Sequence, residues 1–402
     1  MLPPFPHNCI MPYEAVNAQI QEVLRSIRIG NAKVDNGRVH SALISDRRFG
    51  SDSSRAVIGI PTRGCGYARS RYGGCSVCGH NASMLWRKSM DLQEILQDFE
   101  ESLESLVDSR PTTICAYTSG SFLDQNELSL EGQEEIMRRI GALPYVDTVA
   151  IESLPYFVNR KKLELLRSHL GSRKIVIGMG LDSSSDLVRR LCFQRHIGIK
   201  DYMEAVRVCN EFEVESVSYL VYGNPLLSKS ICVMDTAQSL HDVFDLGFSI
   251  ASIEPVAIQP KTIQYAFAKA GLFKIPSIWD LYSLLRSYRN LFVKYSSKIF
   301  LGGQVFTPIP LLSLRTCREC LERVKKLTPY VNPGFWSGIP IENRCSCGQE
   351  STNNPTERYD DRSIVAVIQE NLDKLNNKIR VLEDAGSKSR EVCFPELMSG
   401  TV

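Results

Sequence analysis

Apolar residues recur along this chain in two patterns that alternate with each other. Short runs of apolar and β-branched residues predict buried strands, and stretches with apolar residues three or four positions apart predict amphipathic helices. The predicted strands cover residues 57–61, 113–117, 148–151, 175–181, 216–221 and 250–258. The predicted helices between them cover residues 92–106, 128–140, 161–170, 202–212 and 236–244. This alternation predicts a parallel sheet with right-handed crossovers.

The number of repeats indicates the kind of sheet. Six strand–helix repeats fit an α/β fold with a partial (β/α)6, TIM-like barrel better than a closed barrel of eight strands. In both architectures the chemistry lies at the carboxyl ends of the strands. Residues that directly follow the predicted strands are therefore the first candidates for a functional site.

The segments outside the repeats have a different character. Residues 14–29 and 262–295 have helical spacing, as do residues 362–384, whereas residues 296–360 are irregular and rich in Gly, Pro, Asn and Cys. We predict four regions: a helical extension at 1–50, the partial barrel at 51–295, a Cys-rich metal-binding region at 296–360, and a terminal helix and tail at 361–402.

Composition and charge narrow the functional classes. Of the 402 residues, 43% are hydrophobic and 23% are charged, as in ordinary globular proteins. A formal net charge of +2 argues against broad, unspecific nucleic-acid binding but leaves room for a local basic patch. No apolar run reaches the roughly 18 residues that span a bilayer, and the first residues lack a secretory signal. We therefore expect a cytoplasmic protein without a membrane partner.

Thirteen cysteines in such a compartment suggest metal ligation rather than disulfides. Cys65, Cys75 and Cys78 lie on one glycine-rich loop directly after the first predicted strand of the repeats. Thiolates suit iron–sulfur clusters and zinc. Three thiolates on a 4Fe–4S cluster leave one iron open to a substrate or cofactor. The alternatives are a zinc site completed by His80 and a chance grouping.

The C-x9-C-x2-C spacing after a strand resembles the radical S-adenosylmethionine (SAM) superfamily, although the usual signature there is C-x3-C-x2-C. Within that superfamily the sequence is most similar to the radical SAM subunit of archaeosine synthase and its elongator-type relatives. The segments that carry the resemblance are residues 61–65, 117–124, 151–156 and 178–183, together with the late cysteines.

The resemblance implies a specific chemistry. Cys65, Cys75 and Cys78 would ligate a 4Fe–4S cluster, and SAM would chelate the fourth iron. One electron from an external reductant, such as flavodoxin or ferredoxin, would cleave SAM to methionine and a 5′-deoxyadenosyl radical. That radical abstracts hydrogen from the substrate, while the protein supplies position and excludes water.

Strand-end residues are candidates for binding SAM. After the second strand, Ser119, Gly120 and Ser121 stand where the resemblance places the turn that pairs with the methionine amine; a sterically required turn is the alternative. Glu152 ends the third strand and could accept bonds from ribose hydroxyls or hold the amine. A solvated or helix-capping acid would look the same in the sequence.

Later strand ends add further candidates. Asp182 and Ser183 follow the fourth strand, where they could bind SAM or cap the helix that starts near Ser185. Arg195 could contact the SAM carboxylate, and the adjacent His196 could move a proton; a surface role is the alternative. Gln259 after the sixth strand, like Asn224 after the fifth, could line the adenine or substrate pocket or simply form a turn.

A second cysteine group occupies the irregular region. Two close pairs, formed by Cys317 with Cys320 and by Cys345 with Cys347, predict a closed four-thiolate metal site. Structural zinc would only fold this region. A second, auxiliary 4Fe–4S cluster could instead relay electrons, bind substrate or give up sulfide.

The sequence is compatible with several substrates and partners. Archaeosine-type enzymes act on a lysine-modified 7-deazaguanine in transfer RNA, cleave a C–N bond and use a partner subunit. Arg63, Arg69 and Arg71 could contact phosphate in such a modified tRNA, or form a solvated basic face. The near-neutral charge favours a nucleoside-type small molecule. Radical sulfur insertion into a natural-product intermediate and a zinc-stabilised RNA-binding scaffold without catalysis are further alternatives.

Overall fold

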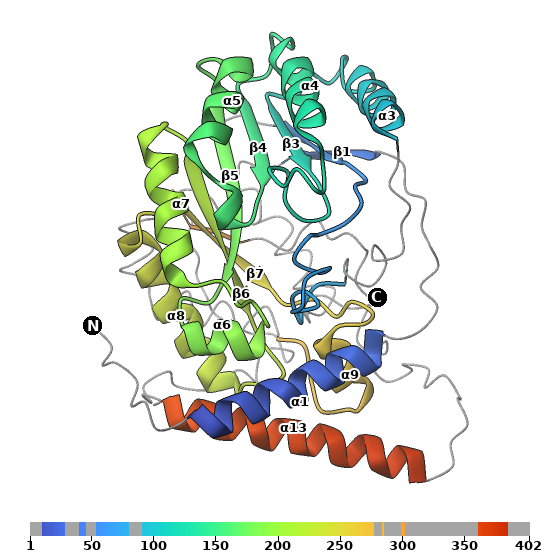
Figure 1. Ribbon diagram of the computed structural model, residues 1–402, viewed down its shortest axis with the longest axis vertical. Helices are drawn as coiled ribbons and strands as arrows, with labels where there is room; N and C mark the ends of the chain where they lie inside the picture. The colour runs from blue at the N-terminus through green and yellow to red at the C-terminus, as the bar shows by residue number, and fades with distance from the viewer. Residues whose placement is uncertain are drawn as a thin grey trace, which may run out of the picture.

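The computed structural model describes residues 10–28, 40–45, 54–79, 91–276, 284, 299–301 and 361–384. Its centre is one sheet whose eight strands lie side by side in the order in which they occur along the chain (Figure 1). The strands are β1 (His40–Ser45), β2 (Ser54–Gly59), β3 (Thr113–Tyr117), β4 (Thr148–Glu152), β5 (Lys174–Asp182), β6 (Glu215–Tyr222), β7 (Ile250–Pro255) and β8 (Ile299–Leu301).

Strand direction confirms the predicted partial barrel. The strands from β2 to β8 pair in parallel, and only β1 joins the sheet in the antiparallel sense. Because each crossover moves one strand further in the same direction, the sheet curls into a half-barrel. The six predicted strands are the six from β2 to β7. The two outermost strands, β1 and β8, were not predicted.

Helices cover the outer face of the sheet and its carboxyl end. The helices are α1 (Ile10–Arg28), α3 (Leu92–Glu104), α4 (Leu130–Gly141), α5 (Arg160–Leu170), α6 (Asp186–Cys192), α7 (Ile199–Glu211), α8 (Lys229–Asp245), α9 (Ile263–Lys269) and α13 (Asp361–Asp384), with one 3-10 turn at Pro155–Phe157. Side-chain caps explain several boundaries that differ from the prediction. Helix α4 starts after Ser129 and α8 starts after Ser228, because each serine accepts a bond from the first helical turn.

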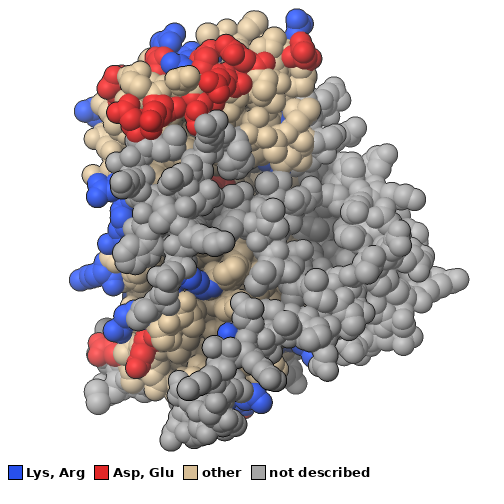
Figure 2. Space-filling model, turned by 90° about the vertical axis from the view of Figure 1, so that its right-hand side faces the viewer, with Lys and Arg blue, Asp and Glu red and all other residues tan. Residues whose placement is uncertain are grey.

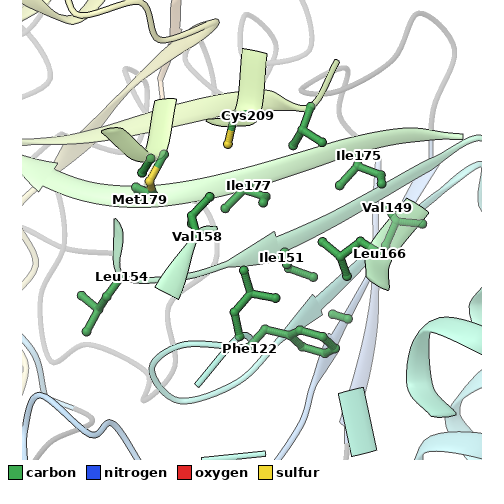
Figure 3. Packing of buried hydrophobic residues seen from close by; sticks show 14 of the residues in the cluster. Phe122, Val149, Ile151, Leu154, Val158, Leu166, Ile175, Ile177, Met179 and Cys209 are labelled. Carbon is green, nitrogen blue, oxygen red and sulfur yellow. The ribbon is translucent and has the colours of Figure 1, made fainter. Parts of the chain in front are cut away.

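The main core lies between the sheet and the outer helices. Figure 3 shows Val149 and Ile151 of β4 beside Ile175 and Ile177 of β5, with Leu166 of α5 packed against them. Alternate residues of a strand point to opposite faces. The residues between these therefore line the concave face, where a smaller apolar cluster contains Val57, Cys115, Ala150, Val176, Val217, Ile250 and Phe300.

A second core joins the two ends of the chain. Helices α1 and α13 lie side by side at the bottom of Figure 1, next to α6 and α9, which follow the carboxyl ends of β5 and β7. The buried residues that α1 and α13 contribute are Val16, Ile20, Val23, Leu24, Ile364, Ile368, Leu372 and Leu375. Their three- and four-residue spacing is the one that the sequence showed. This core places α1 at the end of the sheet where chemistry is expected.

The predicted helix at 262–295 and the predicted Cys-rich region fall partly or wholly outside the described residues. Of the predicted helix at 262–295, the structure describes residues 262–276, which contain α9, and the helical residue Leu284. The Cys-rich segment 302–360 lies outside the described residues. The four predicted regions therefore stay a prediction. In the part of the chain that the structure describes, no helix is both long and apolar enough to cross a membrane.

Candidate functional site

The loop from Cys65 to Cys78 follows β2 at the carboxyl end of the sheet and folds into successive turns. Within it, the amide of Gly73 donates to the Ser70 carbonyl at 3.0 Å, and the amide of Cys78 donates to the Cys75 carbonyl at 3.3 Å. Gly73 and Gly74 have φ values of +68° and +86°. Two consecutive left-handed residues are accessible to glycine at little cost. These glycines therefore turn the chain back towards Cys75.

Ser76 anchors the part of the loop between Cys75 and Cys78. Its amide donates to the Phe193 carbonyl at 3.0 Å, and its hydroxyl donates to the Cys192 carbonyl at 2.5 Å. Its own carbonyl accepts from the amide of Ile263, the first residue of α9, at 3.0 Å. Three bonds to segments that follow β5 and β7 thus hold the Cys75–Cys78 pair at the carboxyl end of the sheet.

Tyr67 fixes the longer, nine-residue section. Its hydroxyl donates to the Gln194 carbonyl at 2.7 Å and accepts from the His196 amide at 2.7 Å. The Tyr72 ring stacks between Tyr67 and His196, with centroid distances of 5.7 and 4.6 Å. Burial, aided by nearby Arg190, lowers the pKa of His196 to about 4, so its ring is neutral at pH 7.

Glu127 joins this loop to the loop after β3, and sequence reasoning missed it. Its carboxylate accepts from the amide of Gly66 at 2.9 Å and from the amide of Ser121 at 3.0 Å. Burial raises the pKa of Glu127 to about 7, although the two backbone bonds act in the opposite direction. Its position six residues after Ser121, in a strand-end loop, was the available signal.

Gly120 packs directly against the first cysteine. A Cβ placed on Gly120 would lie 2.7 Å from the Cα of Cys65 and would also overlap the Glu127 carboxylate. Real Cβ atoms essentially never approach other atoms so closely. The glycine predicted at this strand end is therefore required by the close approach of two backbones.

Asp182 and Arg195, predicted as separate SAM contacts, form one buried ion pair. The Nε of Arg195 donates to the Oδ2 of Asp182, and the side chains are 11% and 4% exposed. Asp182 has a φ of +63° beside a bulge in β5, and a Cβ on Gly180 would lie 2.8 Å from the Arg195 guanidinium. The cap that α6 uses is Ser185, so the alternative of Asp182 as that cap is wrong.

Burial and nearby charges shift the pKa values of Cys65 and Cys75. Burial raises the pKa of both Cys65 and Cys75 to about 12; Arg195 lowers the pKa of Cys75, while Asp182, Cys78 and Cys65 raise it further. A bound metal reverses this balance because it deprotonates its thiol ligands. No three Cys, His, Asp or Glu side chains in the described segments are gathered tightly enough to hold a single metal ion.

Comparisons of the sequence with known proteins found distant relatives. No family model matches the chain. Archaeosine synthase subunit beta of Methanosarcina acetivorans is 23% identical over 272 residues, which are 68% of this chain and 77% of that protein. The subunit of the same name from Thermococcus kodakarensis is 23% identical over 247 residues, 60% of this chain and 74% of its own. The chain is therefore similar to both of these subunits over 60% or more of its own length.

Solved structures of the radical SAM superfamily resemble the chain more distantly. A radical SAM methyltransferase from Sphaerobacter thermophilus gives a TM-score of 0.42 at 13% identity and covers 69% of this chain and 76% of that one. The fold follows from the strand order itself.

The remaining site predictions lie around the same loop. Ser119 is partly exposed beside Gly120, and Glu152 ends β4. The Ser121 hydroxyl is buried and accepts from the amide of Leu154 at 3.0 Å. Gln259 accepts from the amide of Gly79 at 2.9 Å, so its side chain holds the end of the cysteine loop. Each candidate is at the carboxyl end of the sheet, but its contact with SAM stays a prediction.

Of the other residues singled out in the sequence, the structure describes Asn224 but not His80 or the late cysteines. The Asn224 side chain accepts from the amide of Leu226 at 2.9 Å, which is a local turn contact, and it donates to the more distant Cys192 carbonyl at 3.1 Å. His80 and the late cysteines Cys317, Cys320, Cys345 and Cys347 lie outside the described residues.

Ser183 faces α8 through a buried carboxyl group. Its hydroxyl donates to Asp235 at 2.7 Å, and burial raises the pKa of Asp235 to about 7. Folded protein therefore holds a proton on Asp235 that the unfolded chain releases near pH 4. Between about pH 4 and pH 7 this difference lowers the free energy of unfolding as pH rises.

Replacing Asp235 with asparagine should remove that pH dependence. We expect the free energy of unfolding of Asp235→Asn, relative to that of the native protein, to rise by roughly 1–3 kcal/mol when the pH is raised from 5 to 8. Urea unfolding at both pH values measures the gain. Asp245→Asn, an exposed position on the same helix, is the control that should show no such gain. Parallel pH profiles for Asp235→Asn and the native protein would contradict the assignment.

Proposed function

We propose that this protein cleaves SAM reductively to methionine and a 5′-deoxyadenosyl radical and abstracts hydrogen from a nucleoside-type substrate. The observation that carries the proposal is the cysteine loop itself. Three cysteines stand at the carboxyl end of a half-barrel, on a loop held by bonds from four other segments. A loop needed only as a connection would not require so many buried anchors.

The residues fit a 4Fe–4S cluster on Cys65, Cys75 and Cys78. When bound with SAM on its open iron, such a cluster supplies the one-electron reduction that breaks the SAM carbon–sulfur bond. The chain's own residues contribute position and exclusion of water: Cys75 is only 7% exposed, and Gly120 allows the β3 loop to close over Cys65. An external one-electron donor, such as flavodoxin or ferredoxin, is required.

The charges around the loop support binding of a polar cofactor. Arg195 is buried between Asp182 and Cys75, whose charges both favour its cationic form. We propose that this guanidinium steadies the negative charge of the thiolates and that Asp182 keeps it in place. The strand-end residues Ser119 and Glu152 would hold the methionine and ribose portions of SAM.

A modified tRNA is the substrate that the relatives favour. Both named relatives are archaeosine synthase subunits, which supports a 7-deazaguanine base of tRNA as substrate and a second subunit as partner. Exposed Arg63 lies just before the cysteine loop and exposed Arg71 lies on it, with Arg69 between them, and all three would contact phosphate.

The charge on one face indicates where an RNA would bind. Figure 2 shows carboxylates gathered at the end of the molecule formed by α3 and α4, with a few lysines and arginines beside them and others nearer the middle. The exposed acids of α3 are Glu94, Glu100, Glu101 and Glu104. An RNA backbone would be repelled from this end and would meet the protein nearer the cysteine loop.

The late cysteines add a second metal site to the proposal. Cys317, Cys320, Cys345 and Cys347 would hold a second 4Fe–4S cluster or zinc, and only a cluster would allow sulfide donation. About eight irons per chain after anaerobic purification indicate two clusters, and about four irons with one zinc indicate a structural tail. We expect the protein to act in the cytoplasm, where thiols stay reduced.

Anaerobic incubation with SAM and a chemical reductant tests the proposal. We expect 5′-deoxyadenosine and methionine in equal amounts, measured by chromatography, and none when the reductant is omitted. Adding tRNA that carries the lysine-modified base should raise the rate, whereas unmodified transcript should not. Iron-loaded protein that forms no 5′-deoxyadenosine would overturn radical chemistry; equal rates with both RNAs would overturn only the tRNA substrate.

A further inference from the structure

Arg28, the last residue of α1, reaches the cysteine loop from a distant part of the sequence. Its Nη1 donates to the carbonyl of Gly73, and its Nη2 donates to the carbonyl of Cys75 at 2.7 Å. The two acceptors are 45 and 47 residues away along the chain. One guanidinium therefore holds both ends of the Gly73–Cys75 turn.

This two-pronged contact fixes the turn in a way that lysine cannot reproduce. The guanidinium is planar and presents its N–H groups in a rigid fork, so it sets the relative position of two carbonyls at once. The turn contains the left-handed Gly73 and Gly74, which have no side chains to pack. Arg28 supplies from outside the constraint that these glycines lack, and Cys75 is the residue whose position it determines.

The surroundings of Arg28 also favour a negatively charged neighbour. Its Nε is buried, with no hydrogen-bond partner among the described residues. No carboxylate of the described segments pairs with this guanidinium, unlike Arg195, which pairs with Asp182. A partly buried cation without a carboxylate partner is costly unless an anion accompanies it.

The packing of α1 fixes the position of Arg28. Val23 and Leu24 of the same helix are buried in the second core, against α6, α9 and α13. Arg28 therefore extends from a fixed helix end rather than from a free arm. The terminal helices belong to the site because they hold this guanidinium.

We propose that Arg28 is a positioning residue for the cluster on Cys65, Cys75 and Cys78: its fork places Cys75, and its charge stabilises the reduced cluster. The inference rests on the proposed function, since it requires a cluster on these thiols. Reduction adds negative charge near the guanidinium, so the cation favours the reduced state over the oxidised one. Loss of the cation should make the cluster harder to reduce, while loss of the fork should make it easier to remove.

Substitutions at two arginines of α1 test both roles. Arg28→Gln removes the charge and Arg28→Lys keeps it without the fork; the same two substitutions at exposed Arg25 are matched controls. The readouts are iron and sulfide per chain, the rate of iron loss to a chelator, and an anaerobic redox titration followed by electron paramagnetic resonance. Circular dichroism reports whether each variant folds.

We expect Arg28→Gln to lower the ratio of reduced to oxidised cluster at a fixed potential about tenfold, equivalent to ~59 mV for one electron. Arg28→Lys should keep the native potential but lose iron to the chelator several-fold faster than Arg25→Lys. A native potential in Arg28→Gln, or a chelator rate in Arg28→Lys equal to that of Arg25→Lys, overturns the corresponding role.

The outcomes separate this inference from the proposed function. If the native protein binds no cluster, the proposed function fails before any Arg28 variant is compared. If the native protein binds a cluster and both Arg28 variants match their Arg25 controls, only the inference fails. Should Arg28→Gln not fold, the comparison of Arg28→Lys with Arg25→Lys still decides the positioning role.

Discussion

Replacing Cys75 with alanine is expected to abolish 5′-deoxyadenosine formation and to remove the iron of the first cluster. Cys75 is the buried member of the three thiols, and its backbone is held by Arg28 on one side and Ser76 on the other. Two thiols cannot replace three on a cluster that must also leave one iron open for SAM. Iron content, the cluster absorbance and 5′-deoxyadenosine together measure the effect.

A control distinguishes loss of a ligand from loss of a buried thiol. Cys209→Ala removes a thiol on α7 whose pKa burial raises to about 12, as burial does for Cys75, but which packs in the outer core. We expect this variant to keep its iron and its activity, with at most a modest loss of stability. A Cys75→Ala protein that retains native iron content and activity would refute the cluster assignment.

Gly120→Ala is expected to reduce activity about 100-fold, the loss that a displacement of about 1 Å can produce in a catalytic site. The added Cβ would lie 2.7 Å from the Cα of Cys65, which cannot rotate away. The Glu127 carboxylate would also have to move, and the amides of Gly66 and Ser121 would then lose their acceptor. Iron content should fall with activity, because the displaced residue, Cys65, is one of the three proposed cluster ligands.

A second glycine serves as the matched control for Gly120→Ala. At Gly198 a Cβ would meet only the Asp201 carboxylate, at 3.5 Å, an ordinary contact. Gly198→Ala should therefore keep native iron content and native 5′-deoxyadenosine formation. If Gly120→Ala behaves like Gly198→Ala in both assays, the close approach of the β3 loop to Cys65 has no role in holding the cluster.

The interior of the fold was largely predictable from the sequence. Parallel strands covered on both faces consist of continuous apolar runs, and such runs identified the six strands from β2 to β7. The two edge strands were missed for a related reason. Strand β1 pairs on one side and its described side chains are mostly exposed, and β8 has three residues, so neither forms a long apolar run.

The site was predictable only in part. The cysteines and the strand-end residues were found because the carboxyl ends of parallel strands meet at one edge of a sheet. Sequence reasoning treated Asp182 and Arg195 as independent ligands, whereas the structure joins them in one ion pair. Arg28 was read only as part of an amphipathic helix, and Glu127 was missed.

The sequence by itself determined the strand–helix alternation, the terminal helices and the three-thiol loop, because each depends on spacing between residues that are neighbours in the chain. Only the tertiary structure decided what surrounds the thiols. The contacts of Tyr67 with Gln194 and of Arg28 with Cys75 span 127 and 47 residues. Which distant group reaches such a loop depends on how the helices pack around the sheet, and no local spacing records it.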